Sequence, residues 1–493
     1  MIFNSMHFLL FFPIVVLIYF IIPKRVKYIW LLVCSYYFYM SWNAKYAILI
    51  AGSTVITWAG GVLIEKASKQ NIRKMCLVAV LLSNLGILFF FKYFDFFLEN
   101  INRVLAHING KVLEIPFDVL LPVGISFYTF QALGYTIDVY RGDIKAEKNI
   151  LRYALFVSFF PQLVAGPIER SKNLLKQVNV DHSFEWERAK KGLLLMLWGF
   201  FQKIVIADRI ALCVTNVYNN YTVFSGVQIA LATALFAVQI YCDFAGYSEI
   251  AIGAAQVMGF DLMQNFQTPY FSKSVAEFWR RWHISLSTWM RDYIYIPLGG
   301  NRCGKLRKYF NLMVTFLVSG LWHGASWNYI VWGGLNGFYQ VAGDATKKIR
   351  EGIKKKCRIN TECFSYRLFQ MAITFVLIDF AWLFFRAPSM SAALHMIWHG
   401  LHSIGPMSWL DTNNILGITT LGMGEKDFYV MLLSIIILVV VDYFRNRFSI
   451  RQKLEKQNAV FRWAIYYIAI FVILIFGIYG AEFDASSFIY FQF

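Results

Sequence analysis

The chain has 493 residues, of which 58% are hydrophobic and only 15% are charged, and its formal net charge is +18. A soluble domain carries about 25% charged residues, so the composition excludes an ordinary soluble protein and predicts an all-α polytopic membrane protein. The basic residues are scattered among short loops, which indicates the positive-inside rule and argues against a nucleic-acid partner. A cytoplasmic ligand that carries phosphates is an additional explanation of the charge.

Apolar segments long enough to span a bilayer recur along the chain. Outside the centre they cover residues 7–23, 28–43, 46–64, 75–91, 117–139, 365–385, 428–444 and 461–480. The loops after the first, third and fifth segments are rich in lysine and arginine, so we expect them in the cytoplasm and both termini outside it. The first segment lacks the basic start and cleavage site of a signal peptide, so we expect it to be retained as a helix.

The centre of the chain, residues 150–345, does not divide into clean spans. Residues 151–167 contain two prolines and a glycine and are predicted to be broken or re-entrant, whereas 193–207 and 227–242 have the character of spans. Irregular backbone at membrane depth is tolerated only where it is buried in protein or lines a wet cavity. We therefore expect the functional site in the centre. We expect one membrane domain in three parts, covering residues 1–140, 141–345 and 346–493.

An aromatic and basic stretch follows residue 273. Ser274 and Glu277 have the spacing of a capping box, which predicts a helix that begins there and continues to Tyr293. Helical spacing gives it an aromatic face and a polar face. The polar face is predicted to carry Arg280, His283, Ser287 and Arg291. This amphipathic helix is expected near the cytoplasmic interface, where its arginines, Arg281 included, either meet lipid phosphates or line a substrate channel.

Asp243 and Glu249 lie beside or within apolar helices. Buried carboxylates are usually paired. An ion pair or a helix-end role is therefore as strongly expected for them as a direct catalytic role.

His323 lies between two strongly apolar stretches. A titratable group at membrane depth is costly and is a functional-site hypothesis by default, and an imidazole moves protons near neutral pH. Small neighbours such as Ser319 permit close approach of a substrate, and Trp322 and Trp327 offer flat surfaces to an acyl chain or a sugar ring. A core histidine with satisfied hydrogen bonds is the alternative explanation.

The cysteines carry no signature of a structural site. None of the seven forms a CxxC pair, and no convincing metal-binding or Walker-type motif occurs. We expect no disulfide framework, no metal and no permanently bound cofactor.

Several of these stretches together resemble the membrane-bound O-acyltransferase family in its bacterial branch. The matching stretches are residues 121–127, 161–170, 241–248, 278–300 and 319–327. The resemblance covers essentially the whole chain, and the length and aromatic C-terminus are most similar to the alginate O-acetyltransferase-like group. It implies a fold of about 11–13 membrane helices, with re-entrant and interfacial helices, around a central tunnel and funnel. It also implies that His323 is the catalytic histidine and His283 a second site residue.

The resemblance further implies a membrane O-acyltransferase of the bacterial cytoplasmic membrane. It would move an acetyl group from cytoplasmic acetyl-CoA, a co-substrate, to an extracytoplasmic polysaccharide. Transfer would be direct or through a partner transferase of the serine-hydrolase-like (SGNH) type, for which residues 486–493 are a candidate docking element. The candidate donor- or substrate-binding residues are Arg280, Arg281, Ser287, Arg291, Asp243, Trp322, Trp327 and Ser319.

Two other functions stay open. The first is an acyl or D-alanyl transferase that takes its group from a carrier-protein thioester for teichoic-acid-type modification. The second is a transporter or channel with a polar path lined by His323 and Asp243. Transporters often contain internal repeats, and the sequence shows none.

Overall fold

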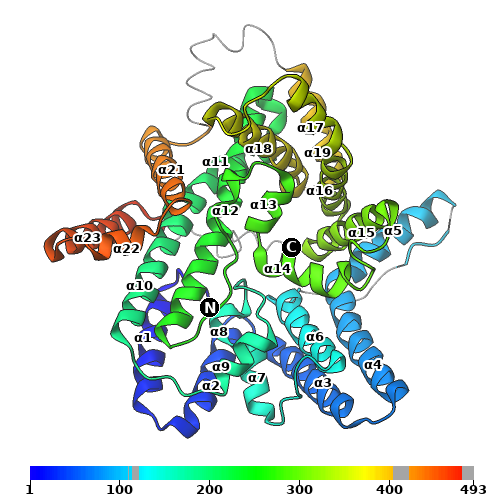
Figure 1. Ribbon diagram of the computed structural model, residues 1–493, viewed down its shortest axis with the longest axis vertical. Coiled ribbons are helices and arrows are strands. Elements are labelled where there is room, and N and C mark those ends of the chain that lie inside the picture. Colours follow the sequence, from blue (N-terminus) through cyan, green and yellow to red (C-terminus); the bar gives the residue numbers. More distant parts are fainter. Residues whose placement is uncertain (109, 114–120, 404–420, 480–493) are drawn as a thin grey trace. The chain divides into compact units, whose positions relative to one another are not determined.

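The computed structural model describes residues 1–108, 110–113, 121–403 and 421–479 (Figure 1). Within these residues the chain forms helices and no strand. Six helical segments are long and apolar enough to cross a membrane, at residues 44–66, 70–107, 226–257, 364–386, 425–445 and 459–476. The prediction of an all-α polytopic membrane protein is confirmed.

The chain divides into two compact units. Unit 1 consists of Met1–Met196 and Tyr247–Gln264, and unit 2 consists of Leu197–Gly246 and Asn265–Phe493. Each is described by itself below. The expected single membrane domain in three parts stays a prediction.

Unit 1 contains most of the helices up to Phe200. They are α1 (Met6–Ile21), η1 (Lys24–Val26), α2 (Lys27–Met40), η2 (Ala44–Tyr46), α3 (Ala47–Lys66), α4 (Gln70–Leu88), η3 (Phe89–Tyr93), α5 (Phe94–His107), α6 (Ile125–Arg141), α7 (Ile150–Ser158), α8 (Phe160–Leu163), η4 (Ser171–Leu175), α9 (Lys176–Val178) and most of α10 (Trp186–Phe200). Its α4, η3 and α5 together form the segment 70–107. Helices α3, α4 and α6 pack against one another, and α2 packs against α7 (Figure 1).

Two features of unit 1 follow from its turn-forming residues. Helix α6 begins at Ile125 because Gly124 has a φ of 76°, a left-handed conformation that suits glycine. The predicted span 117–139 therefore has its helix start at Ile125, and residues 117–120 of that prediction lie outside the described residues. The segment 151–167 is broken as predicted, because α7 ends at Ser158 and α8 is a single turn.

Unit 2 contains the remaining helices. They are η5 (Phe201–Ala207), α11 (Asp208–Asn219), η6 (Tyr221–Val223), most of α12 (Gly226–Val257), η7 (Pro269–Phe271), α13 (Val275–Arg281), α14 (Ile284–Met290), η8 (Arg291–Tyr295), α15 (Lys305–His323), α16 (Trp327–Ala345), α17 (Lys347–Lys356), α18 (Phe364–Arg386), α19 (Met390–His402), α21 (Glu425–Arg445), α22 (Ile450–Glu455) and α23 (Ala459–Phe476). Helices α15 and α16 form a tight hairpin, and α16 also packs on α18.

The two central spans differ in detail from the prediction. The span predicted at 193–207 is the end of α10 followed by η5, a π-helical stretch of seven residues. Such wide turns are rare and occur often at functional sites. The span predicted at 227–242 continues as α12 through the glycine- and alanine-rich residues that follow, up to Val257.

Candidate active site

The hairpin of α15 and α16 in unit 2 positions His323. This histidine is the last residue of α15, and only 3% of it is exposed. A β-carbon added to Gly320 would overlap the carbonyl oxygen of Tyr329, and one added to Gly333 would overlap the carbonyl oxygen of Phe316. Glycines at these two places let the helix backbones touch. The close contact fixes the end of α15 and hence the imidazole.

Aromatic side chains surround the His323 ring. It meets Trp322 at 4.9 Å, Trp332 at 5.0 Å and Phe385 at 5.3 Å between ring centroids, each edge to face. Trp332 in turn stacks on Trp382 at 5.7 Å. These rings exclude water from around the imidazole, and a dry environment strengthens the electrostatic interactions of a polar group.

His283 lies in a turn that interrupts the predicted continuous helix. Helix α13 ends before it and α14 begins after it, and His283 has φ 42° and ψ 54°. A left-handed conformation costs a residue with a side chain about 1–3 kcal/mol. Asn265 holds the turn, because its carbonyl oxygen accepts from the Ile284 N–H at 2.9 Å and its side-chain oxygen accepts from the Ser285 hydroxyl at 2.6 Å. The start of the helix is as predicted, since the Ser274 hydroxyl caps α13.

The turn brings His283 close to His323. The two ring centroids are 6.3 Å apart, and His283 is fully buried, edge to face with Phe244 at 4.6 Å. His283 lies outside the six helices that can cross a membrane. Burial lowers the pKa of its imidazole to about 3, so the ring is neutral at pH 7 and offers one N–H donor and one acceptor nitrogen.

The predicted polar face shared by Arg280, His283, Ser287 and Arg291 is wrong. The left-handed turn changes the helical phase, so His283 is buried while Arg280 and Arg291 are exposed. The Ser287 hydroxyl donates to the carbonyl oxygen of Trp282 at 3.3 Å and so braces the same turn.

The three arginines of this stretch differ in their surroundings. Arg281 is ion-paired with Glu277 at 2.7 Å within α13. Arg291 is ion-paired with Asp292 at 2.8 Å, and Arg280 is exposed. Arg280 and Arg291 are exposed, the latter beside its Asp292 partner, whereas only 21% of the Arg281 side chain is exposed, so a soluble ligand reaches the first two more easily.

Asp243 belongs to a buried ion-pair cluster that includes Lys203. The Lys203 ammonium lies 2.5 Å from an Asp243 oxygen and 2.8 Å from an Asp208 oxygen, and all three side chains are buried. The contacts of Asp243 therefore agree with an ion-pair role, which is one of the two roles expected from the sequence. Lys203 was missed from the sequence, although it is the one charged residue in the apolar run 193–207. Phe244, which contacts His283, follows Asp243 directly in α12, so the cluster holds the helix segment that supports the histidine.

The remaining candidates divide between the core and the surface. Ser319 and Trp322 are buried in α15 beside His323, whereas Trp327, the first residue of α16, is 49% exposed. Among the described residues no group of three or more histidine, cysteine, aspartate or glutamate side chains could hold a metal ion. Residues 486–493, the candidate docking element, lie outside the described part of the chain.

Comparison with known proteins places this arrangement in one family. The profile of the membrane-bound O-acyltransferase family matches residues 143–385, which include both histidines. A probable alginate O-acetylase of Pseudomonas syringae pv. tomato is 37% identical over 444 residues, covering 87% of this chain and 83% of that protein.

Two other relatives have different acceptors in their names. A peptidoglycan O-acetyltransferase of Helicobacter pylori is 34% identical, covering 80% of this chain and 79% of that protein. A teichoic acid D-alanyltransferase of Streptococcus thermophilus is 31% identical, covering 51% of this chain and 63% of that protein. The expected enzyme class, an acyltransferase, is confirmed. The chain belongs to the membrane-bound O-acyltransferase family, and its buried histidine pair lies within the part that the family profile matches.

Proposed function

We propose that this enzyme takes an acetyl group from cytoplasmic acetyl-CoA and delivers it across the bacterial cytoplasmic membrane for O-acetylation of an extracytoplasmic polysaccharide. The observation that carries the proposal is the pair His323 and His283, buried together in an aromatic surround. The names of the alginate and peptidoglycan relatives support the acetyl group and the polymer acceptor.

His323 acts as the general base in this proposal. It accepts the proton of the acceptor hydroxyl while the hydroxyl oxygen attacks the thioester carbonyl, and the carbon–sulfur bond then breaks to release the thiol, which regains a proton. The neutral His283 donates its ring N–H to the oxyanion that develops on the carbonyl. Proton transfer by a positioned base contributes about 10²–10⁴-fold to the rate.

The remaining candidates bind or position the substrates. Arg280 and Arg291 bind the phosphates of the donor from the cytoplasm, since exposed guanidinium groups bond phosphate oxygens in pairs. Ser319, Trp322 and Trp327 line the path of the acyl group. Asp243 is a positioning residue that acts through Phe244. The acceptor is the polymer itself or an SGNH-like transferase, and both chain termini lie outside the cytoplasm.

The proposal is tested in proteoliposomes with labelled acetyl-CoA on one side and an acceptor polysaccharide on the other. We expect labelled polysaccharide, or labelled acyl-enzyme on the partner transferase when it is added, with the wild-type protein. His323→Gln should abolish the transfer, while His402→Gln, which changes an exposed histidine at the end of α19, should leave it intact. Full transfer by a folded His323→Gln protein would sink the assignment of the base.

A carrier-protein thioester is the second candidate donor, because the teichoic acid D-alanyltransferase shares 31% identity over half of this chain. The same proteoliposomes distinguish the two donors. Transfer from a labelled carrier thioester, with none from acetyl-CoA, would replace the proposed donor and keep the role of His323.

A further inference from the structure

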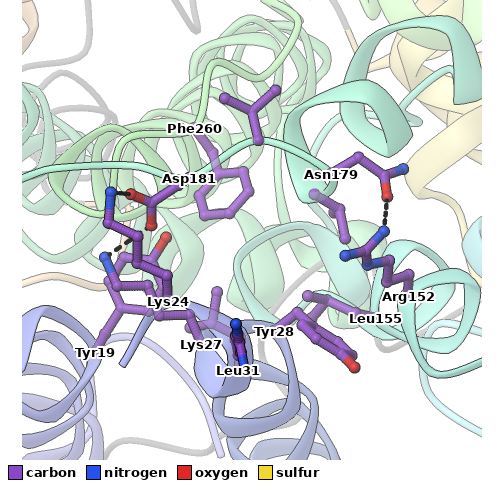
Figure 2. A pocket seen from close by; sticks show the side chains of 13 residues that line it. Tyr19, Lys24, Lys27, Tyr28, Leu31, Arg152, Leu155, Asn179, Asp181 and Phe260 are labelled. Atoms are coloured by element: carbon purple, nitrogen blue, oxygen red, sulfur yellow. Dashed lines mark hydrogen bonds and ion pairs between the residues drawn. The ribbon is translucent and has the colours of Figure 1, made fainter. Parts of the chain in front are cut away.

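Unit 1 contains a cavity of about 230 Å³, whereas His283 and His323 belong to unit 2. The cavity is lined by Tyr19, Lys24, Arg25, Lys27, Tyr28, Leu31, Arg152, Leu155, Val178, Asn179, Val180, Asp181 and Phe260 (Figure 2). These residues come from the end of α1, from η1 and the start of α2, from α7, from the end of α9 and the loop after it, and from the segment after α12. All of them belong to unit 1.

The cavity has an apolar floor and a cationic rim. Tyr19, Leu31, Leu155 and Phe260 are each no more than 2% exposed and form the floor. The lining side chains include one carboxylate, that of Asp181, and four cations, which leaves an excess of positive charge. The cations are Lys24, Arg25, Lys27 and Arg152. Such a site suits an anionic group attached to an apolar body.

Asp181 organises two of the four cations. Its carboxylate oxygens lie 2.8 Å from the Lys24 ammonium and 3.2 Å from the Lys27 ammonium, and Lys27 also donates to the carbonyl oxygen of His182 at 2.8 Å (Figure 2). The hydrogen bond from Lys24 holds the pKa of Asp181 below its usual range. The lysines are thereby fixed at the rim, and the carboxylate stays ionised at neutral pH.

The two arginines have no carboxylate partner among the described residues that line the cavity. Arg152 donates to the side-chain oxygen of Asn179 at 2.7 Å and lies over the ring of Tyr28, 5.2 Å from its centroid (Figure 2). Arg25 is exposed at the rim. Both guanidinium groups therefore have donors to offer to a phosphate.

Size and surroundings indicate the source of that phosphate. Sites that enclose a whole small-molecule ligand measure about 300–1,000 Å³, so this smaller cavity fits a headgroup. The loop that carries Asp181 also exposes two apolar side chains: Val180, which lines the cavity and is 61% exposed, and Phe184, which is 53% exposed and packs on Phe20. An acyl chain lying against these side chains would bring its own phosphate to the cationic rim.

We propose that the cavity of unit 1 is a binding site for the phosphate headgroup of an anionic phospholipid, with Arg25 and Arg152 as the principal phosphate ligands and the exposed side chains of Val180 and Phe184 as contacts of an acyl chain. The site does not depend on the proposed acyl transfer, because its ligand is a resident lipid and not the donor.

The test measures lipid retention by native mass spectrometry of the purified protein in detergent supplemented with phosphatidylglycerol or phosphatidylcholine. We expect the wild-type protein to retain phosphatidylglycerol in preference to phosphatidylcholine. The double variant Arg25→Gln/Arg152→Gln should weaken this retention about 10- to 100-fold, as the loss of charge-assisted hydrogen bonds does. Arg25→Gln alone, at an exposed position where folding is not at stake, should weaken it several-fold.

The matched control removes the same charge elsewhere. Lys354→Gln/Lys355→Gln, on the exposed basic helix α17, should retain phosphatidylglycerol as the wild type does. Equal loss in the control and the arginine variant would mean attraction by overall charge and would overturn the proposal. It would also be overturned if no lipid is retained, or if inorganic phosphate or coenzyme A at millimolar concentration displaces the lipid through the same arginines.

Discussion

Helices α12 and α23 are both apolar enough to cross a membrane, yet their surroundings are opposite. In α12, 78% of the most apolar segment is buried inside the protein, and in α23 only 6% is. Helix α12 carries a carboxylate, Asp243, which is tolerated because Lys203 pairs with it. Helix α23 exposes apolar side chains such as Phe471 and Leu474. A helix that faces lipid needs only to be apolar, whereas a helix inside the protein is specified by its contacts and is able to carry charge beside the candidate site.

The largest stability effect should come from the ion-pair cluster of the buried helix. Lys203→Met leaves Asp243 and Asp208 buried without their cation, which should lower the free energy of unfolding by about 3–5 kcal/mol. Denaturant unfolding in detergent micelles measures it. The triple variant with Asp208→Asn and Asp243→Asn should recover most of the loss. Unchanged stability of Lys203→Met would show that the buried charges do not depend on this cation.

The hairpin of His323 offers a matched pair of glycines. Gly320→Ala should destabilise the protein by about 1–3 kcal/mol and slow acyl transfer, because the new β-carbon overlaps the Tyr329 carbonyl. Gly334→Ala on α16 meets only a Leu317 methyl at 3.7 Å, so it should be neutral or stabilising by up to about 1 kcal/mol. Thermal unfolding of the two variants tests the contrast, and equal effects would argue against backbone contact at Gly320.

The turn of His283 should respond more modestly. Ser285→Ala removes the hydroxyl bonded to Asn265 and should cost about 0.5–1.5 kcal/mol. Because the turn places His283, we expect kcat to fall while KM for the donor changes little. Ser83→Ala, which removes an exposed hydroxyl from α4, is the control. A change in KM alone would mean that the turn serves donor binding and not the chemical step.

The smallest effect belongs to the lipid-facing helix. Leu474→Ala in α23, at a side chain that is 61% exposed, should change stability by no more than about 0.5 kcal/mol. Unfolding in detergent and in lipid nanodiscs measures it. A loss of several kcal/mol would show that α23 packs against protein, and the contrast with α12 would disappear.

The helical class and the broken segment after residue 150 could be predicted from the sequence, because composition and proline are local signals. The sequence also singled out His283 and His323, whose rings the fold brings within 6.3 Å of each other, and their catalytic roles stay predictions. The left-handed turn at His283 could not be predicted, since its neighbours keep a helical pattern and the turn is held by Asn265, which is distant along the chain. The role of Lys203 was hidden for the same reason. The sequence shows that Lys203 is a lone cation in an apolar run, but only the tertiary packing shows that Asp243 is its partner.

The central claim is that His323 and His283 act in one site, and a double-mutant cycle on the rate of acyl transfer tests it most directly. His323→Ala should lower the rate by about 10²–10⁴-fold. Because both side chains serve the same transition state, the double variant His323→Ala/His283→Ala should be little slower than His323→Ala alone. The account would be contradicted if the rate reduction in the double variant equals the product of the two single reductions. It would also be contradicted if a folded His323→Ala enzyme keeps the wild-type rate.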